Sequence, residues 1–216
     1  MICFGIYCLA GIVNLASALF FKEGVRKISK CCLMPALVVF YFLAAQRFNW
    51  LIPAALVFSW AGDFLLIKKE KPLFFKLGLA AFLVSHIFYI IAFILIAGNI
   101  HTLAFIISIV VAIPLTLFIL KLLKAPKPMK IPVAAYAVVI MVMSIFALQL
   151  MLAWPGFPGT LIFGASLVYL FSDTFMAYLL FNGKPKYFNF ITMIPYIIAQ
   201  GGIIMGLILG FGGWIS

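Results

Sequence analysis

The sequence LIPAALVFSWAGDFLLI, residues 51–67, is apolar throughout except for Ser59 and one carboxylate, Asp63. A stretch of this length and composition is typical of a helix that crosses a bilayer, which takes roughly 17–25 residues. An aspartate near the middle of such a helix costs about 2.5–3.5 kcal/mol on insertion scales. Asp63 therefore indicates that the protein needs a carboxylate inside the membrane.

A second apolar stretch, residues 160–181, contains the other such carboxylate, Asp173, in the sequence LFSDT. The chain has only four acidic residues, and Glu23 and Glu70 lie among lysines in short polar segments. Asp63 and Asp173 are thus the two acidic residues whose positions need a functional explanation.

The composition, 68% hydrophobic and 9% charged over 216 residues, excludes a soluble globular protein, for which about 25% charged residues is typical. Apolar runs recur from one end of the chain to the other. We therefore predict an all-α polytopic membrane protein with one integral membrane domain, residues 1–216. The eight predicted transmembrane spans are residues 2–21, 31–45, 51–67, 77–97, 102–123, 131–151, 160–181 and 191–213.

The net charge of +11 comes from basic residues in the connections between the predicted spans. Of the 15 lysines and arginines, all but Arg47 fall in the first, third, fifth and seventh connections or at the adjoining helix ends. This bias predicts that these connections are cytoplasmic and that both termini lie outside, in the inner membrane if the source is bacterial. It also favours contact of the lysines with anionic lipid headgroups rather than with nucleic acid.

Matching features in the two halves of the chain indicate an internal repeat. Lys71-Pro72 leads into the fourth span and Lys184-Pro185 into the eighth, and the two membrane aspartates stand in the third and seventh spans. Because each half has an even number of spans, the copies would be parallel, related by an axis along the membrane normal. We predict repeats at about residues 1–97 and 102–213.

Further polar groups accompany the aspartates at similar predicted depths, in the cytoplasmic half of the membrane. One turn of helix separates His86 from Tyr89 and Tyr196 from Gln200, so each pair shares a helix face. Lys30 lies at the predicted start of the second span, and we expect no basic residue within a span to pair with the aspartates. The sequence predicts one polar pocket that opens to the cytoplasm or the inner leaflet. The alternative for each group is a hydrogen bond that only holds the bundle together.

Familiar hydrolytic motifs, Gly-x-Ser-x-Gly and His-Glu-x-x-His, do not occur in the sequence. Asp63, His86 and Asp173 are possible metal ligands, but three ligands without a supporting shell are a weak signal, and we expect no metal or cofactor. The remaining possibility is acid–base catalysis by two carboxyl groups, in which one donates a proton and the other is ionised.

Several short motifs follow one another along the chain: Lys30 with Pro35, Gly62-Asp63, His86-x-x-Tyr89, Ser172-Asp173 and Tyr196-x-x-Ala199-Gln200. In this order, they resemble the YhhN family of membrane lysoplasmalogenases (alkenylglycerophospholipid hydrolases). The resemblance implies hydrolysis of the vinyl-ether bond of lysoplasmalogen to a fatty aldehyde and glycerophosphoethanolamine or glycerophosphocholine. It implies that Asp63 and Asp173 are catalytic. The residues that it implies in substrate binding are His86, Tyr89, Tyr196 and Gln200, with Lys30 as our choice for the phosphate.

Two other functions fit the same residues. A small proton-coupled transporter could use Asp63 and Asp173 as a proton relay at the junction of two repeats. An enzyme on this scaffold could instead act on another lysolipid ether or ester. In the enzymatic reading, the partners are a single-chain phospholipid and the surrounding membrane lipids, with no nucleic acid and no obligate protein partner.

Overall fold

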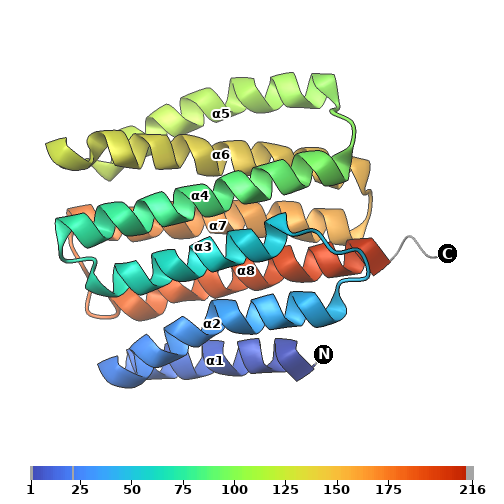
Figure 1. The fold of residues 1–216 in the computed structure, drawn as a ribbon. Helices are drawn as coiled ribbons and strands as arrows, with labels where there is room; N and C mark the ends of the chain where they lie inside the picture. Colours follow the sequence, from blue (N-terminus) through green and yellow to red (C-terminus); the bar gives the residue numbers. More distant parts are fainter. Residues whose placement is uncertain (1, 21, 213–216) are drawn as a thin grey trace.

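The computed structural model describes residues 2–20 and 22–212 and contains helices joined by short connections (Figure 1). Residues 21 and 213, which end the first and last predicted spans, lie outside the described residues. The α-helices are α1 (Ile2–Leu19), α2 (Glu23–Ala44), α3 (Leu51–Leu65), α4 (Pro72–Ala97), α5 (Thr102–Leu123), α6 (Lys130–Ala153), α7 (Phe157–Asn182) and α8 (Phe188–Gly212). The 3₁₀ turns are η1 (Leu66–Lys68) and η2 (Lys127–Met129).

Seven helices within the described residues, α2 to α8 with η1 and η2 extending α3 and α6, are long and apolar enough to cross a membrane. The apolar part of α1, Cys3–Leu19, is shorter. Many large apolar side chains on the outside of the bundle are exposed, for example Leu43, Leu103 and Phe118. Exposing these side chains to water would be unfavourable, but an apolar surface is expected where a membrane protein faces lipid. The chain is therefore an integral, multi-pass membrane protein.

Several helices begin earlier than hydropathy predicts, and the shift is largest for α2. The predicted second span starts at residue 31, whereas α2 starts at Glu23. Glu23 in the first turn complements the positive end of the helix dipole, and lysine and arginine are good helix formers. The basic segment is consequently helical, and Lys30 lies inside α2 rather than before it.

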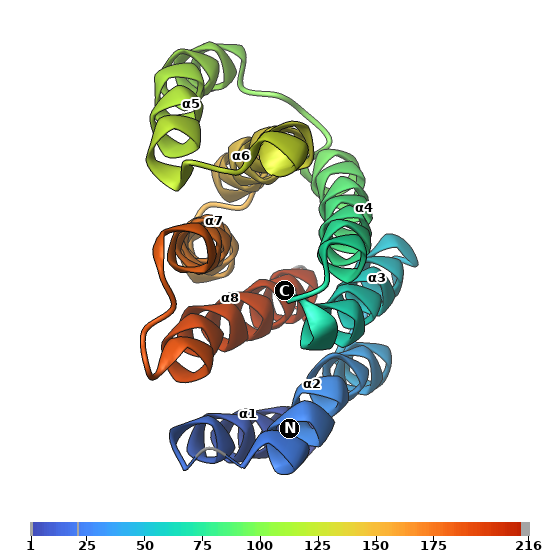
Figure 2. The same ribbon diagram turned by 90° about the vertical axis from the view of Figure 1, so that its left-hand side faces the viewer.

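The helices run alternately up and down, and the α3–α4, α5–α6 and α7–α8 connections share one end of the bundle (Figure 1). Viewed along the bundle, α3, α4, α6, α7 and α8 form a ring, because each packs on the next and side chains of α8 bond to α3 (Figure 2). Outside this ring, α5 packs on α6, while α2 packs on α3 and α8. The candidate functional residues come from the ring and from α2.

Close packing of α3 on α4 fixes the position of the first aspartate. A Cβ atom added to Gly62 would lie 2.5 Å from the ring of Phe82, and one added to Gly78 would lie 2.7 Å from Leu66. Only glycine allows the two backbones to approach in this way. Asp63, the residue after Gly62, is thereby held between α4 and the interior of the ring.

Candidate functional site

A single pocket brings the two predicted aspartates together. The pocket is lined by residues from the amino-terminal halves of α2 and α8, from η1, and from α3 to α7. The cavity has a volume of about 60 Å³ and is partly open to the outside. The polar residues that line it are Arg26, Lys30, Asp63, Lys69, Tyr136, Ser172, Asp173, Thr174, Asn189, Thr192 and Tyr196.

Asp63 is buried, with 1% of its surface exposed, and both of its carboxylate oxygens have partners. The Lys30 ammonium lies 3.0 Å from Oδ1, and the Tyr196 hydroxyl donates a hydrogen bond of 2.7 Å to Oδ2. The expectation that no cation within a span pairs with the aspartates is wrong for Asp63. The physical reason is the early start of α2, which carries Lys30 into the bundle at the level of Asp63.

Asp173, on α7, has a different environment. The Tyr136 hydroxyl of α6 donates a hydrogen bond to its Oδ2. The ion pairs found among the described residues involve Glu23, Asp63 and Glu70, so none of them includes Asp173. The pocket therefore contains one carboxyl that is paired with a cation and one that is held by a neutral phenol.

Behind the pocket wall lies a hydrogen-bonded polar cluster centred on Gln200 of α8. Its amide oxygen accepts from Tyr89 at 3.0 Å, and its amide nitrogen donates to Tyr169 at 2.8 Å and to Ser59 at 3.1 Å. Ser59 and Ser85 share a further hydrogen bond of 2.8 Å. These side chains are fully buried, and the cluster ties α3, α4, α7 and α8 together.

His86 is also fully buried behind the wall. Its Nδ1 lies 2.5 Å from the Phe82 carbonyl oxygen, which can only accept, so Nδ1 carries the proton. Nε2 has no hydrogen-bond partner among the described residues. The ring packs edge-on against Tyr136 and tilted against Tyr169, with centroids 5.3 and 4.8 Å apart. His86 thus supports the tyrosine that binds Asp173.

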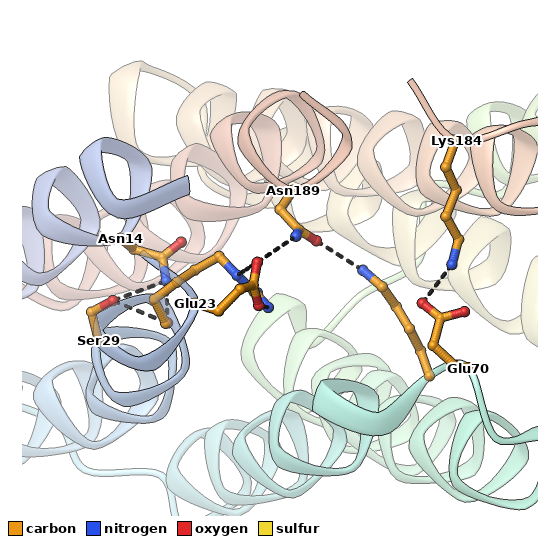
Figure 3. Close-up of polar contacts among 8 residues, drawn as sticks. Asn14, Glu23, Ser29, Glu70, Lys184 and Asn189 are labelled. Atoms are coloured by element: carbon orange, nitrogen blue, oxygen red, sulfur yellow. Dashed lines mark hydrogen bonds and ion pairs between the residues drawn. The ribbon is translucent and has the colours of Figure 1, made fainter. Parts of the chain in front are cut away.

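At one end of the pocket, which we call its mouth, polar side chains of α2, of α8 and of the η1–α4 connection are joined by hydrogen bonds (Figure 3). Arg26 pairs with Glu23 through a bidentate contact, with distances of 3.1 and 2.5 Å. The Asn189 side chain links the two sides: its amide nitrogen donates to Glu23 at 3.4 Å, and its oxygen accepts from the Lys69 ammonium at 3.1 Å. On the outer side, Lys184 pairs with Glu70 at 2.5 Å.

The structure divides the predicted site residues into two groups. Lys30, Asp63, Asp173 and Tyr196 line the pocket, whereas the others lie in the layer behind it: His86, Tyr89 and Gln200. No group of three histidine, cysteine, aspartate or glutamate side chains able to hold a metal occurs within residues 2–20 and 22–212.

Sequence reasoning missed three groups at this site: Tyr136, Tyr169 and the pair Lys69–Asn189. Tyr169 precedes Asp173 by four residues on α7, so helical spacing could have indicated it. Tyr136 carries no local signal, because a tyrosine in a membrane helix costs little and its partner comes from another helix. Lys69 looked like any other lysine in a basic connection.

Comparison with known proteins gives the same result as the motifs. The family model of the YhhN family matches residues 25–207. A protein of Mus musculus named lysoplasmalogenase TMEM86B is 33% identical over 178 residues, which cover 82% of this chain and 72% of the mouse protein. No solved structure matches the chain. Because the family match extends over most of the sequence, including both aspartates and the residues around them, this chain belongs to the YhhN family.

Proposed function

We propose that this protein is a membrane hydrolase that cleaves the vinyl-ether bond of lysoplasmalogen, giving a fatty aldehyde and glycerophosphoethanolamine or glycerophosphocholine. The observation that carries the proposal is the pair of carboxyls in one pocket, Asp63 bound to Lys30 and Asp173 bound to a neutral tyrosine. Membership of the YhhN family and the name of the mouse relative support the choice of substrate.

Hydrolysis of a vinyl ether starts with a proton. We assign its transfer to Asp173, because the Lys30 ammonium holds Asp63 in the anionic form. The Tyr136 hydroxyl occupies Oδ2 of Asp173, which leaves the other oxygen to carry the proton. The π electrons of the double bond take this proton at the β-carbon, and an oxocarbenium ion forms at the α-carbon.

Asp63 then stabilises the cation as a fixed negative charge in a site of low dielectric constant. Water adds to the α-carbon and returns its proton to Asp173, so the acid is regenerated. The hemiacetal collapses when its hydroxyl proton moves to the glycerol oxygen and the carbon–oxygen bond breaks. The same division between a proton donor and an anionic carboxylate operates in glycoside hydrolysis. The reaction consumes one water and needs no other reactant.

The rest of the pocket suits a single-chain lipid. Beyond the polar groups, its lining is apolar and comes mostly from α4 to α7, for example Leu79, Ile119, Ile140 and Met176. An alkenyl chain buried there gains roughly 0.8 kcal/mol for each methylene group relative to water. We propose that all eight helices cross the membrane as two parallel four-helix repeats, with both termini outside and the pocket mouth at the cytoplasmic face.

The test is release of fatty aldehyde from lysoplasmalogen by the purified protein in detergent. The matched control substrate is the saturated alkyl ether of the same chain length, which has no double bond to protonate and should not be cleaved. A transporter would release no aldehyde, because transport requires a sealed membrane. An enzyme for other lysolipids would release fatty acid from the acyl ester instead. Absence of aldehyde with a folded protein contradicts the proposal.

A further inference from the structure

Three basic side chains line the pocket, Arg26 and Lys30 from α2 and Lys69 after η1, and they differ in their partners. Arg26 is paired with Glu23, and Lys30 is paired with Asp63. Among the described residues, the Lys69 ammonium has direct contacts with neutral groups only. It donates to the Asn189 amide oxygen at 3.1 Å and lies 4.1 Å from the centre of the Phe188 ring.

The surroundings of Lys69 disfavour its positive charge. Burial and the nearby cations Lys30, Arg26 and Lys184 lower the pKa of the Lys69 ammonium to about 7, while Glu70 acts in the opposite direction. A partly buried cation among other cations is stabilised when an anion enters beside it. Lys69 is thus a pocket-lining cation without an ion-pair partner among the described residues, because the carboxylates near the mouth, Glu23 and Glu70, are paired with Arg26 and Lys184.

Backbone dipoles add to this positive potential. The α8 helix begins at Phe188, so Asn189 lies in its first turn, and that turn contains no acidic residue. The α2 helix begins at Glu23, and Arg26 follows within its first turn. The amino-terminal ends of two helices thus lie near the same mouth. Glu23 already complements the α2 dipole, whereas the α8 end carries a partial positive charge that favours an anion.

The spacing along α2 relates the mouth to the carboxyls. Arg26 and Lys30 are four residues apart, which corresponds to about 6 Å along the helix axis. Lys30 holds Asp63, so an anion beside Arg26 and Lys69 would lie about one helical turn from Asp63. That separation is comparable to the glycerol unit that joins the phosphate of a lysolipid to its vinyl-ether oxygen.

We propose that Lys69, with Arg26 beside it, forms the binding site for the phosphodiester of the lysolipid headgroup, and that Lys30 serves Asp63 instead. This inference rests on the proposed function, since it names the headgroup site of the same substrate. Asn189, between Lys69 and Glu23, keeps the two sides of the mouth at a fixed separation. Inorganic phosphate shares the anionic oxygens of the headgroup and is the competing occupant.

Binding is measured first, without catalysis, as the shift in unfolding temperature in a non-ionic detergent. The probes are an acyl lysophosphatidylethanolamine, the monoacylglycerol of the same chain, and inorganic phosphate. The lysophospholipid should stabilise the wild-type protein more than the monoacylglycerol does, and phosphate alone should give a smaller shift. Equal shifts with both lipids overturn the proposal. Stabilisation by phosphate but not by the lysophospholipid also overturns it, in favour of a free-anion site.

Two variants at Lys69 and one control sharpen this test. Lys69→Met should lose the headgroup-dependent shift, and Lys69→Arg should keep it. The control is Lys71→Met, two residues away, exposed and not part of the pocket lining; it should behave as wild type. Retention of the headgroup-dependent shift in Lys69→Met, or its loss in Lys69→Arg with the fold intact, overturns the assignment.

Activity separates this inference from the proposed function. Lys69→Met should raise KM for lysoplasmalogen by at least about tenfold, the effect of one charge-assisted hydrogen bond, with kcat within about twofold. Cleavage of 1-alkenylglycerol, which lacks the phosphate, should not change. If all variants release aldehyde with the wild-type KM, the proposed headgroup site is wrong and the proposed hydrolase activity is supported. If headgroup-dependent stabilisation occurs without aldehyde release, the proposed hydrolase activity is wrong and the proposed phosphodiester site is supported.

The pH dependence of KM provides an independent readout. Protonated Lys69 binds the anion, and because its pKa is about 7 in the free protein, the ammonium form is lost as pH rises above 7. The KM of the wild type should therefore increase above about pH 7, by up to tenfold per unit, and stay flat below it. Lys69→Arg should abolish this increase, since arginine keeps its proton. A wild-type increase that persists in Lys69→Arg contradicts the role of Lys69.

Discussion

Asp173 receives a hydrogen bond from a neutral phenol, whereas Asp63 is joined to an ammonium group, and this difference predicts different results for the two substitutions. Asp173→Asn keeps an oxygen that accepts from Tyr136, so the fold should be preserved. The substitution removes the proposed proton donor, so kcat should fall by at least about 10², the lower range for a general acid. The measurement is aldehyde release together with the unfolding temperature. A folded Asp173→Asn protein with near-normal kcat would show that another group supplies the proton.

Asp63→Asn should affect both stability and activity. It leaves the Lys30 ammonium in the protein interior without its anion, and breaking a buried ion pair in this way typically costs about 3 kcal/mol or more. Adding Lys30→Met should restore most of the unfolding temperature by removing the charge, but it should not restore kcat. Recovery of activity in the double variant would mean that Asp63 acts only as the counter-ion of Lys30.

The two aspartates should behave as one catalytic unit. If Asp173 protonates the double bond and Asp63 stabilises the resulting cation, each substitution disables the same step. The combined variant Asp63→Asn with Asp173→Asn should then be little slower than the slower single variant, because residues that act together are not additive. Steady-state aldehyde release from all three variants tests this. Multiplicative losses would place the two carboxyls in separate steps.

The sequence indicated which residues are energetically unfavourable in a membrane, but it did not indicate which residues contact them. Asp63 and Asp173 could be identified because a carboxylate in an apolar helix needs a reason. Tyr136 could not be identified, because a tyrosine in a membrane helix costs little free energy and its contact with Asp173 depends on how α6 packs on α7. The pairing of Lys30 with Asp63 depends in the same way on the packing of α2 against α3.

At the scale of elements, hydropathy predicted that the helices exist and where α1, α3 and α5 begin, but it misplaced the starts of other helices. α5 has the predicted bounds, because its apolar run ends at basic and proline residues. By contrast, α2 and α4 start eight and five residues before the predicted spans, at Glu23 and Pro72. Charged residues lower hydropathy without lowering helix propensity, and proline suits the first turn of a helix. The misplaced start of α2 led directly to the wrong expectation for Lys30.

The α3–α4 contact gives a prediction about helix packing. Gly62→Ala would place a methyl group 2.5 Å from the Phe82 ring, so one of the helices must shift, and such overpacking costs about 1–3 kcal/mol. The unfolding temperature should fall, and kcat should fall with it because Asp63 moves. The control is Gly164→Ala in α7, where nothing lies within 4 Å of the added atom. Alanine there should be neutral or slightly stabilising, since it favours helix. Equal unfolding temperatures for the two variants would contradict the close packing.

For the whole molecule, the all-α multi-pass architecture was evident from the sequence, and the arrangement of the helices was not. Nothing in the apolar runs indicates that α3, α4, α6, α7 and α8 form a ring or that α5 lies outside it (Figure 2). The order of neighbours depends on side-chain fit between helices that are all apolar, and hydropathy does not encode that fit. The parallel repeat remains a prediction, as does the passage of the shorter α1 through the membrane.

The orientation of the whole bundle is tested by labelling from outside the cell. Fourteen of the fifteen basic residues lie in the α1–α2, α3–α4, α5–α6 and α7–α8 connections or in the adjoining helix ends. These connections share one end of the bundle, and this end should be cytoplasmic (Figure 1). Starting from a variant without Cys3, Cys8, Cys31 and Cys32, a single cysteine is placed at Pro185, exposed in the α7–α8 connection, or at Asn99, exposed in the α4–α5 connection. In intact cells a membrane-impermeant maleimide should label Asn99→Cys and leave Pro185→Cys unlabelled until the membrane is opened. The reverse pattern would invert the topology and place the pocket mouth, with Lys69 and its proposed headgroup site, on the outer surface.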